Sequence, residues 1–244
     1  VILLLVGLIV GTFVIIFGGG GAAIYLGILT GIMQLPAASA ASTSLVTVLP
    51  SLMLGCWTYY KHGQIKVKLG NQMLLTAIPA VIIGSLISQY IPFHLYNLIV
   101  GGILVILGIN MFFQKRNHAG NTKQKYPKLK AGLFGVIGGL MVGVAGMSGG
   151  APIIAGLFLM GLPMINAAAT SSYVLAFMSV VGTIFHIAGG KVDWNIGISL
   201  MIGALIGAAI APALLEKIVH TKIGNYLEPV VAVFLAVLGI KTLL

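Results

Sequence analysis

Two clusters of hydroxyl side chains in apolar surroundings are the residues of this sequence best suited to bind a ligand. They are Ser42, Thr43, Ser44, Thr170, Ser171 and Ser172. Hydroxyl groups donate hydrogen bonds without carrying a charge, so they suit a small oxyanion where a buried fixed charge would be costly. Helix capping and bonding to the preceding helical turn are the alternative roles of such residues. The sequence leaves both interpretations open.

A glycine-rich break precedes each hydroxyl cluster. The first glycine break is GGGG at 18–21, and the second glycine break is GMSGG at 146–150. Backbone amides at a helix N-terminus attract anions, and glycine lets a ligand approach the backbone closely. We therefore interpret the breaks as candidate anion cradles, with close packing of helices as the alternative. The candidate contacts in the breaks are Gly20, Gly21, Ser148, Gly149 and Gly150.

The composition places these residues in a membrane protein. Hydrophobic residues make up 59% of the 244, charged residues make up 7%, and the mean hydropathy is +1.13, whereas a soluble domain is about a quarter charged. Formal charges are absent from 1–60, 69–114 and 131–190, stretches far longer than the roughly 20 apolar residues of one spanning helix. Each stretch must hold several segments, so we expect a multi-pass protein of a cell membrane.

The net charge of +10 does not indicate a nucleic-acid partner, because most of the lysines and arginines fall in loops between apolar segments. Such charges set the topology and contact anionic lipid. The expected partners are therefore membrane lipid and a small-molecule substrate. Cys56 is the only cysteine, so it forms neither an intramolecular disulfide nor a cysteine metal site. We expect no metal and no cofactor.

The chain consists of two related halves. Residues 18–45 and 146–173 share a glycine-rich start, an apolar run, a proline and a hydroxyl cluster, about 128 residues apart. We predict a first transmembrane repeat at 1–113, a basic cytoplasmic linker at 114–130 and a second transmembrane repeat at 131–244. The five hydrophobic segments predicted in each half lie at 1–17, 21–34, 38–60, 70–90 and 95–113, and at 129–145, 150–162, 165–188, 194–215 and 225–243.

Loop charges orient the two halves in opposite senses. Three lysines between 61 and 68 and six basic residues in the linker place both loops in the cytoplasm by the positive-inside rule. In the second half the loop that matches 61–68 has one lysine, Lys191, whereas the next turn has Lys217 and Lys222. The second segments, with about 13 residues each, are too short to span the roughly 30 Å core. The predicted fold is an all-α polytopic membrane protein with an inverted repeat and short broken helices at the glycine breaks, as in many secondary transporters.

Ionisable residues inside a membrane usually mark function, and they are nearly missing from this sequence. The only acids are Asp193, Glu216 and Glu228, all at predicted segment ends, so the sequence offers no carboxylate proton relay. His186, near the end of its segment, is the one candidate for a proton carrier or ligand. The alternative for His186 is a ring bonded to a backbone carbonyl at the membrane interface.

A family resemblance rests on the repeated motif. The glycine break followed by PAASAASTS (36–44) in one half and by PMINAAATSS (163–172) in the other, with the lysine-rich linker between them, resembles the TauE/SafE sulfite exporter family, also called TSUP. The resemblance covers nearly the whole chain. It implies a transporter of small sulfur-containing anions, such as sulfite or organosulfonates, in a prokaryotic inner (cell) membrane. The first break lacks the Ser148 and Pro152 of the second, so unequal contributions of the halves are expected.

Two other functions are open on the sequence. An anion channel would use the same donors as a carrier that works by alternating access. The stretch GMSG at 146–149 also resembles the nucleophile motif of rhomboid intramembrane proteases, with Ser148 as nucleophile and His186 as base. Against the protease, Ser148 aligns with Gly20 in a repeated break, and five plus five inverted segments are not that architecture. We therefore expect a transporter and not an enzyme.

Overall fold

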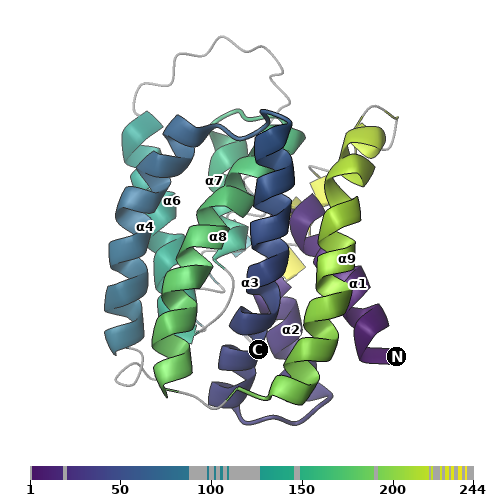
Figure 1. Ribbon diagram of the computed structural model, residues 1–244. Coiled ribbons are helices and arrows are strands. Elements are labelled where there is room, and N and C mark those ends of the chain that lie inside the picture. Colours follow the sequence, from purple (N-terminus) through teal and green to yellow (C-terminus); the bar gives the residue numbers. More distant parts are fainter. Residues whose placement is uncertain are drawn as a thin grey trace.

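The described part of the chain is all-helical in the computed structural model (Figure 1). It covers residues 2–18, 21–87, 127–145, 149–189 and 192–219, with the further positions 98, 102, 105, 106, 109, 221, 226, 229, 230, 232, 233, 236, 237 and 240. The helices are α1 (Ile2–Ile16), α2 (Gly21–Gly31), α3 (Ala37–Lys61), α4 (Val67–Ile87), α6 (Pro127–Ala145), α7 (Gly150–Leu159), α8 (Met164–Gly189) and α9 (Trp194–Val219). No strand occurs among these residues.

The helices coincide with the first four predicted segments of each half. Four of them, α3, α4, α8 and α9, are long and apolar enough to cross a membrane. The helices that follow the glycine breaks are short, with 11 residues in α2 and 10 in α7, as predicted. The predicted fifth segments, 95–113 and 225–243, fall largely outside the described residues. Helix α6 begins at Pro127, inside the stretch predicted as linker; proline is favoured at the first helical position because it needs no N–H partner there.

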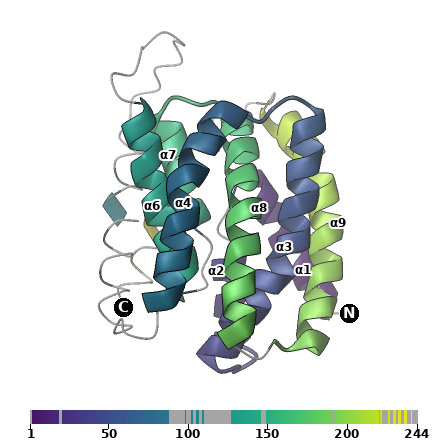
Figure 2. The same ribbon diagram turned by 60° about the vertical axis from the view of Figure 1, so that its left-hand side comes forward.

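Helices of the two halves cross over to pack against each other. Helix α4 of the first half packs along α6 of the second, and α9 of the second half packs along α1 of the first. The long helices α3 and α8 lie between these pairs and contact each other (Figure 1). Figure 2 shows α4 beside α6 on one side and α9 beside α1 on the other. Each half therefore depends on the other for its principal helix contacts.

Small residues allow these crossed pairs to approach closely. A Cβ atom placed on Gly11 of α1 would collide with the backbone of Ala204 in α9. In the other pair, a Cβ on Gly139 of α6 would collide with the carbonyl of Ala77 in α4. Gly11 and Gly139 hold equivalent positions in the two halves, as do Ala77 and Ala204. Such small-residue contacts are the usual means by which membrane helices pack without a hydrophobic driving force.

Basic residues of the described helices gather at one end of the molecule. The loop between α3 and α4, the start of α6 and the end of α9 lie together at the upper end in Figure 1. The lysines at this end are Lys61, Lys66, Lys68, Lys128, Lys130 and Lys217. Asp193 precedes α9 at the opposite end. The positive-inside rule predicts that this lysine-rich end faces the cytoplasm.

The equivalent helices α3 and α8 run in opposite directions. In the view of Figure 1, α3 rises to the lysine-rich end and α8 descends from it. Opposite directions of equivalent helices are what an inverted repeat requires. The inverted repeat of the complete halves stays a prediction, because their fifth segments lie largely beyond the described positions.

Candidate functional site

Two threonines of the hydroxyl clusters bind backbone amides of the opposite half. The Oγ1 atom of Thr43 in α3 accepts a 3.0 Å hydrogen bond from the amide of Asp193, just before α9. The Oγ1 atom of Thr170 in α8 accepts a 3.0 Å hydrogen bond from the amide of Lys66, just before α4. The same number of residues separates Thr43 from Thr170 and Lys66 from Asp193. One contact is therefore made twice, at opposite ends of the α3 and α8 pair.

The first glycine break lies against the second hydroxyl cluster. Ser171 donates its hydroxyl hydrogen to the carbonyl oxygen of Gly18. Gly18 has a φ of +60°, a conformation that glycine adopts without the steric cost of a Cβ. A Cβ at Gly18 would lie 2.8 Å from the Cα of Ala168 in α8 and 2.9 Å from Ile154 in α7. Gly18 is thus held where α1, α7 and α8 meet.

The second glycine break packs against α6. Gly149 is buried, and a Cβ at this position would collide with the carbonyl of Gly138. Close packing of helices, the alternative to an anion cradle, therefore explains why residue 149 is a glycine. Gly150 is buried at the start of α7, and Gly21 is the first residue of α2. Gly20 and Ser148 lie outside the described residues, so the predicted cradles are only partly in view.

The remaining cluster residues have different surroundings. Ser44 donates to the carbonyl of Ala41 at 2.9 Å, which is the local back-bonding expected of a serine inside a helix. Ser42 is buried. The hydroxyl of Ser172 is buried and has no hydrogen-bond partner among the described residues. The structure therefore does not gather the six hydroxyls around one point, because Thr43 and Thr170 lie toward opposite ends of the α3 and α8 pair.

Further buried hydroxyl groups occur in the same helices. They belong to Thr47 and Ser51 in α3 and to Thr183 in α8, and among the described residues their oxygen atoms have no hydrogen-bond partner. They do not stand out in the sequence because each is one hydroxyl in an apolar run. Their helical spacing was the available signal, since Thr47 follows Thr43 by one turn and Ser51 follows Thr47 by another.

The ionisable candidates lie at helix ends or beyond the described atoms. Asp193 accepts a 3.1 Å hydrogen bond at Oδ1 from the amide of Ile196, which is the contact of an N-cap residue. Glu216 is exposed near the end of α9. His186 lies in α8, but its side chain is outside the described atoms, and Glu228 is outside the described residues. Within the described part of the chain, no group of three histidine, cysteine or acidic residues could hold a metal ion.

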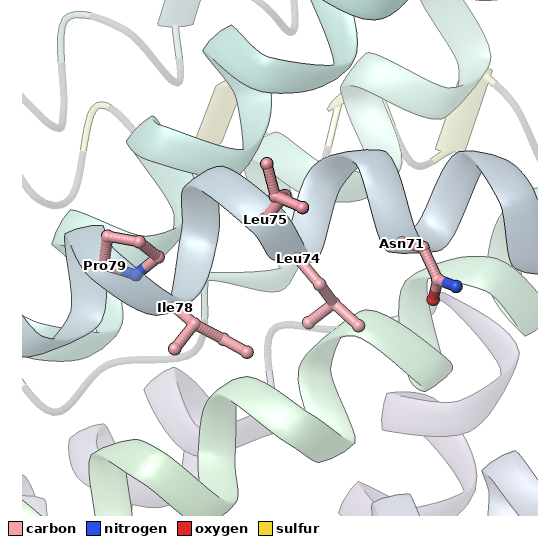
Figure 3. A pocket seen from close by; sticks show the side chains of 5 residues that line it. All are labelled: Asn71, Leu74, Leu75, Ile78 and Pro79. Atoms are coloured by element: carbon pink, nitrogen blue, oxygen red, sulfur yellow. The ribbon is translucent and has the colours of Figure 1, made fainter.

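An open groove of about 450 Å³ runs along α4. It is lined by Asn71, Leu74, Leu75, Ile78 and Pro79 (Figure 3). The side-chain oxygen of Asn71 accepts a 2.7 Å hydrogen bond from the hydroxyl of Tyr173 in α8. Because apolar side chains dominate the lining and Leu75 is 80% exposed, the groove fits lipid better than a hydrated anion.

Comparisons with known proteins agree with this architecture. The family model for the sulfite exporter TauE/SafE matches residues 3–242. Probable membrane transporter protein YdhB of Bacillus subtilis is 27% identical over 240 residues, which are 95% of this chain and 96% of that protein. Probable membrane transporter protein MJ0441 of Methanocaldococcus jannaschii is 28% identical, over 93% of this chain and 87% of the relative. An undecaprenyl-diphosphatase of Limosilactobacillus fermentum matches at 26% identity over only 59% of this chain. The chain, a multi-pass membrane protein, belongs to the sulfite exporter TauE/SafE family of membrane transporters.

Proposed function

We propose that this chain is a secondary transporter of small sulfur-containing anions, of the sulfite or organosulfonate type, that works by alternating access. The observation that carries the proposal is the matched pair of hydrogen bonds, Thr43 to Asp193 and Thr170 to Lys66. Each bond ties one of the central helices to the start of a helix from the other half. Many carriers with two related halves open alternately on either side of a site between them. The two hydrogen bonds are equivalent contacts at the two ends of the α3 and α8 pair, where such opening would take place.

Uncharged donors support an anion as the substrate. The described spanning helices contain buried hydroxyls in α3 and α8, whereas their lysines and acids stand at helix ends. A small oxyanion accepts hydrogen bonds from such hydroxyls. The negative charge would come from the anion, and the protein would not need a buried charged side chain to bind it. The family description names sulfite, so sulfite and organosulfonates are the first substrates to test.

The proposed contacts follow from where the residues lie. We propose that Thr43 and Thr170 close the two ends of the α3 and α8 pair, because their oxygen atoms already accept backbone hydrogen bonds from the other half. The anion contacts proposed in the breaks and clusters are Gly20, Gly21, Ser42, Ser44, Ser148, Gly149, Gly150, Ser171 and Ser172, with His186 as the proposed proton carrier. The membrane domains are proposed at 1–113 and 131–244, joined by the linker at 114–130.

Counterflow in proteoliposomes tests the function. Vesicles with the purified full chain would be loaded with unlabelled sulfite, sulfate, thiosulfate, sulfoacetate or taurine, and the uptake of the same labelled compound would be followed. A carrier accumulates label transiently above equilibrium and saturates with concentration. Flux that neither saturates nor shows counterflow would identify an anion channel. Vesicles that move none of the five compounds faster than protein-free vesicles would refute the proposed function.

A further inference from the structure

Two pairs of buried hydroxyls in α3 and α8 form hydrogen bonds at equivalent positions of the two halves: Thr43 with Thr170, and Ser44 with Ser171. Four other buried hydroxyls have no hydrogen-bond partner among the described residues, and they do not recur in the other half. The unpartnered hydroxyls are Thr47, Ser51, Ser172 and Thr183, and the equivalent residues of the other half are Val174, Met178, Leu45 and Cys56.

The fold does not need a hydroxyl at three of these four positions. Val174, Met178 and Leu45 fill the equivalent places with fully buried apolar side chains. A buried hydroxyl without a partner loses its hydrogen bonds to water and gains nothing in return. Exceptions of this kind in a folded protein call for a specific explanation. The four hydroxyls therefore lower the stability of the resting structure, and a role outside that structure accounts for their presence.

Two of the unpartnered hydroxyls share one face of α8. Ser172 and Thr183 are separated by three helical turns, about 16 Å along the axis, and the buried Ser179 lies on the same face between them. The neighbouring Gly182 is packed among three other helices, since a Cβ there would lie 2.7 Å from Val142 of α6, 3.9 Å from Val81 of α4 and 3.9 Å from Leu45 of α3. The hydroxyls on α8 thus extend over about half of the roughly 30 Å hydrocarbon core.

The other two lie one turn apart on α3. Thr47 faces α9, because a Cβ on Gly197 would lie 3.6 Å from its Oγ1 atom. Ser51 follows one turn later, about 6 Å further along the helix. Since α3 and α8 contact each other and run in opposite directions, the hydroxyls of both helices belong to the same helix pair.

We infer that the unpartnered hydroxyls are the hydrogen-bond donors that replace water around a small oxyanion as it crosses the middle of the protein. This inference rests on the proposed function and names its path. A sulfite, sulfate or sulfonate group presents several acceptor oxygens, and each neutral hydroxyl supplies one donor. Donors spread along the helices let the anion move between weak sites, so that it enters and also leaves.

Replacing each hydroxyl residue by an apolar residue of similar size tests whether the hydroxyls contact the anion, stabilise the fold or do neither. Thr183→Val and Ser172→Ala should unfold at the same temperature as the wild type or higher, because each removes an unpaired polar group. Labelled-sulfite counterflow should nevertheless fall about tenfold or more, as expected when a donor to an anion is lost. Thr183→Ser keeps the hydroxyl and should retain flux. Ser199→Ala, which removes a hydroxyl bonded to Asn195 on the flank of α9, should change neither quantity.

The possible outcomes decide between the interpretations. Thr183→Val and Ser172→Ala with unchanged counterflow would show that the hydroxyls are idle, and the inference would be wrong. A loss of thermal stability as large as that of Thr43→Val would show that they are structural, which also overturns it. These results leave the proposed function intact as long as the wild type shows counterflow. Absence of counterflow in the wild type would instead remove the proposed function, and with it the inference.

Discussion

The side-chain amide of Asn166 in α8 donates a 2.7 Å hydrogen bond to the backbone carbonyl of Gln64, in the loop between α3 and α4. Thr170, one turn further along α8, accepts from the amide of Lys66 in the same loop. The first turns of α8 thus fix both a carbonyl and an amide of a loop from the other half. Neither contact is available to a half that folds alone.

Loss of the threonine hydroxyls should weaken both ends of the molecule. Thr170→Val and Thr43→Val each leave a partly buried backbone amide without its acceptor, which should lower the free energy of unfolding by about 0.5–1.5 kcal/mol. Thermal unfolding in detergent measures the change, and Thr→Ser at either position should recover most of it. Wild-type stability in both valine variants would mean that these hydrogen bonds contribute nothing to closure.

Larger side chains in the crossed packing should separate the helices. Gly11→Leu and Gly139→Leu place side chains against the backbones of Ala204 and Ala77, and overpacking of this kind costs about 1–3 kcal/mol or more. Gly27→Leu is the matched control, because a Cβ there meets nothing within 4 Å. Thermal unfolding of the three variants makes the comparison. Equal stability of all three would contradict the close approach of α1 to α9 and of α6 to α4.

The lysine-rich end should face the cytoplasm. In a Cys56→Ser background, single cysteines at Lys68 and Thr221 should be shielded from an impermeant thiol reagent added to intact cells. A cysteine at Asn195, exposed at the other end of α9, should react. All three should react after the membrane is permeabilised, which controls for accessibility. Labelling of Lys68 and Asn195 positions on the same side would be incompatible with the arrangement of α4 and α9.

Acidic residues should be dispensable for transport. Asp193→Asn keeps a side chain that caps α9, and Glu216→Gln changes an exposed residue, so both variants should retain anion counterflow. Asp193→Ala should lower the free energy of unfolding by about 1 kcal/mol through loss of the cap. A well-folded amide variant without flux would reveal proton coupling through that carboxylate.

The sequence predicts where the helices lie better than what they touch. The apolar run predicted at 38–60 becomes α3 at Ala37–Lys61, because the proline before it and the lysine loop after it fix its ends. The partners of α4 and α9 could not be predicted in the same way, since faces toward lipid and toward protein are both apolar. Helix pairing depends instead on small residues such as Gly11, which a count of hydrophobic residues does not register.

The candidate site residues could be predicted by type, and their role as anion contacts stays a prediction. Thr43 and Thr170 stand out in the sequence because they recur in both halves, and in the structure each accepts a hydrogen bond from a backbone amide of the other half. Thr183 does not recur, so the repeat gives no signal for it. Its lack of a hydrogen-bond partner becomes visible only when its neighbours in space are known.

The crossed helix pairs also govern the order in which the protein can be completed during synthesis. Helix α1 is translated before its principal partner α9, which follows only after the other described helices. The side of α1 that carries Gly11 is therefore not covered by α9 while the intervening helices are made. Helix α4 lacks α6 in the same way, although for a shorter stretch of chain. A ribosome that stalls before α9 thus leaves α1 without its principal partner, a product that quality-control proteases can recognise.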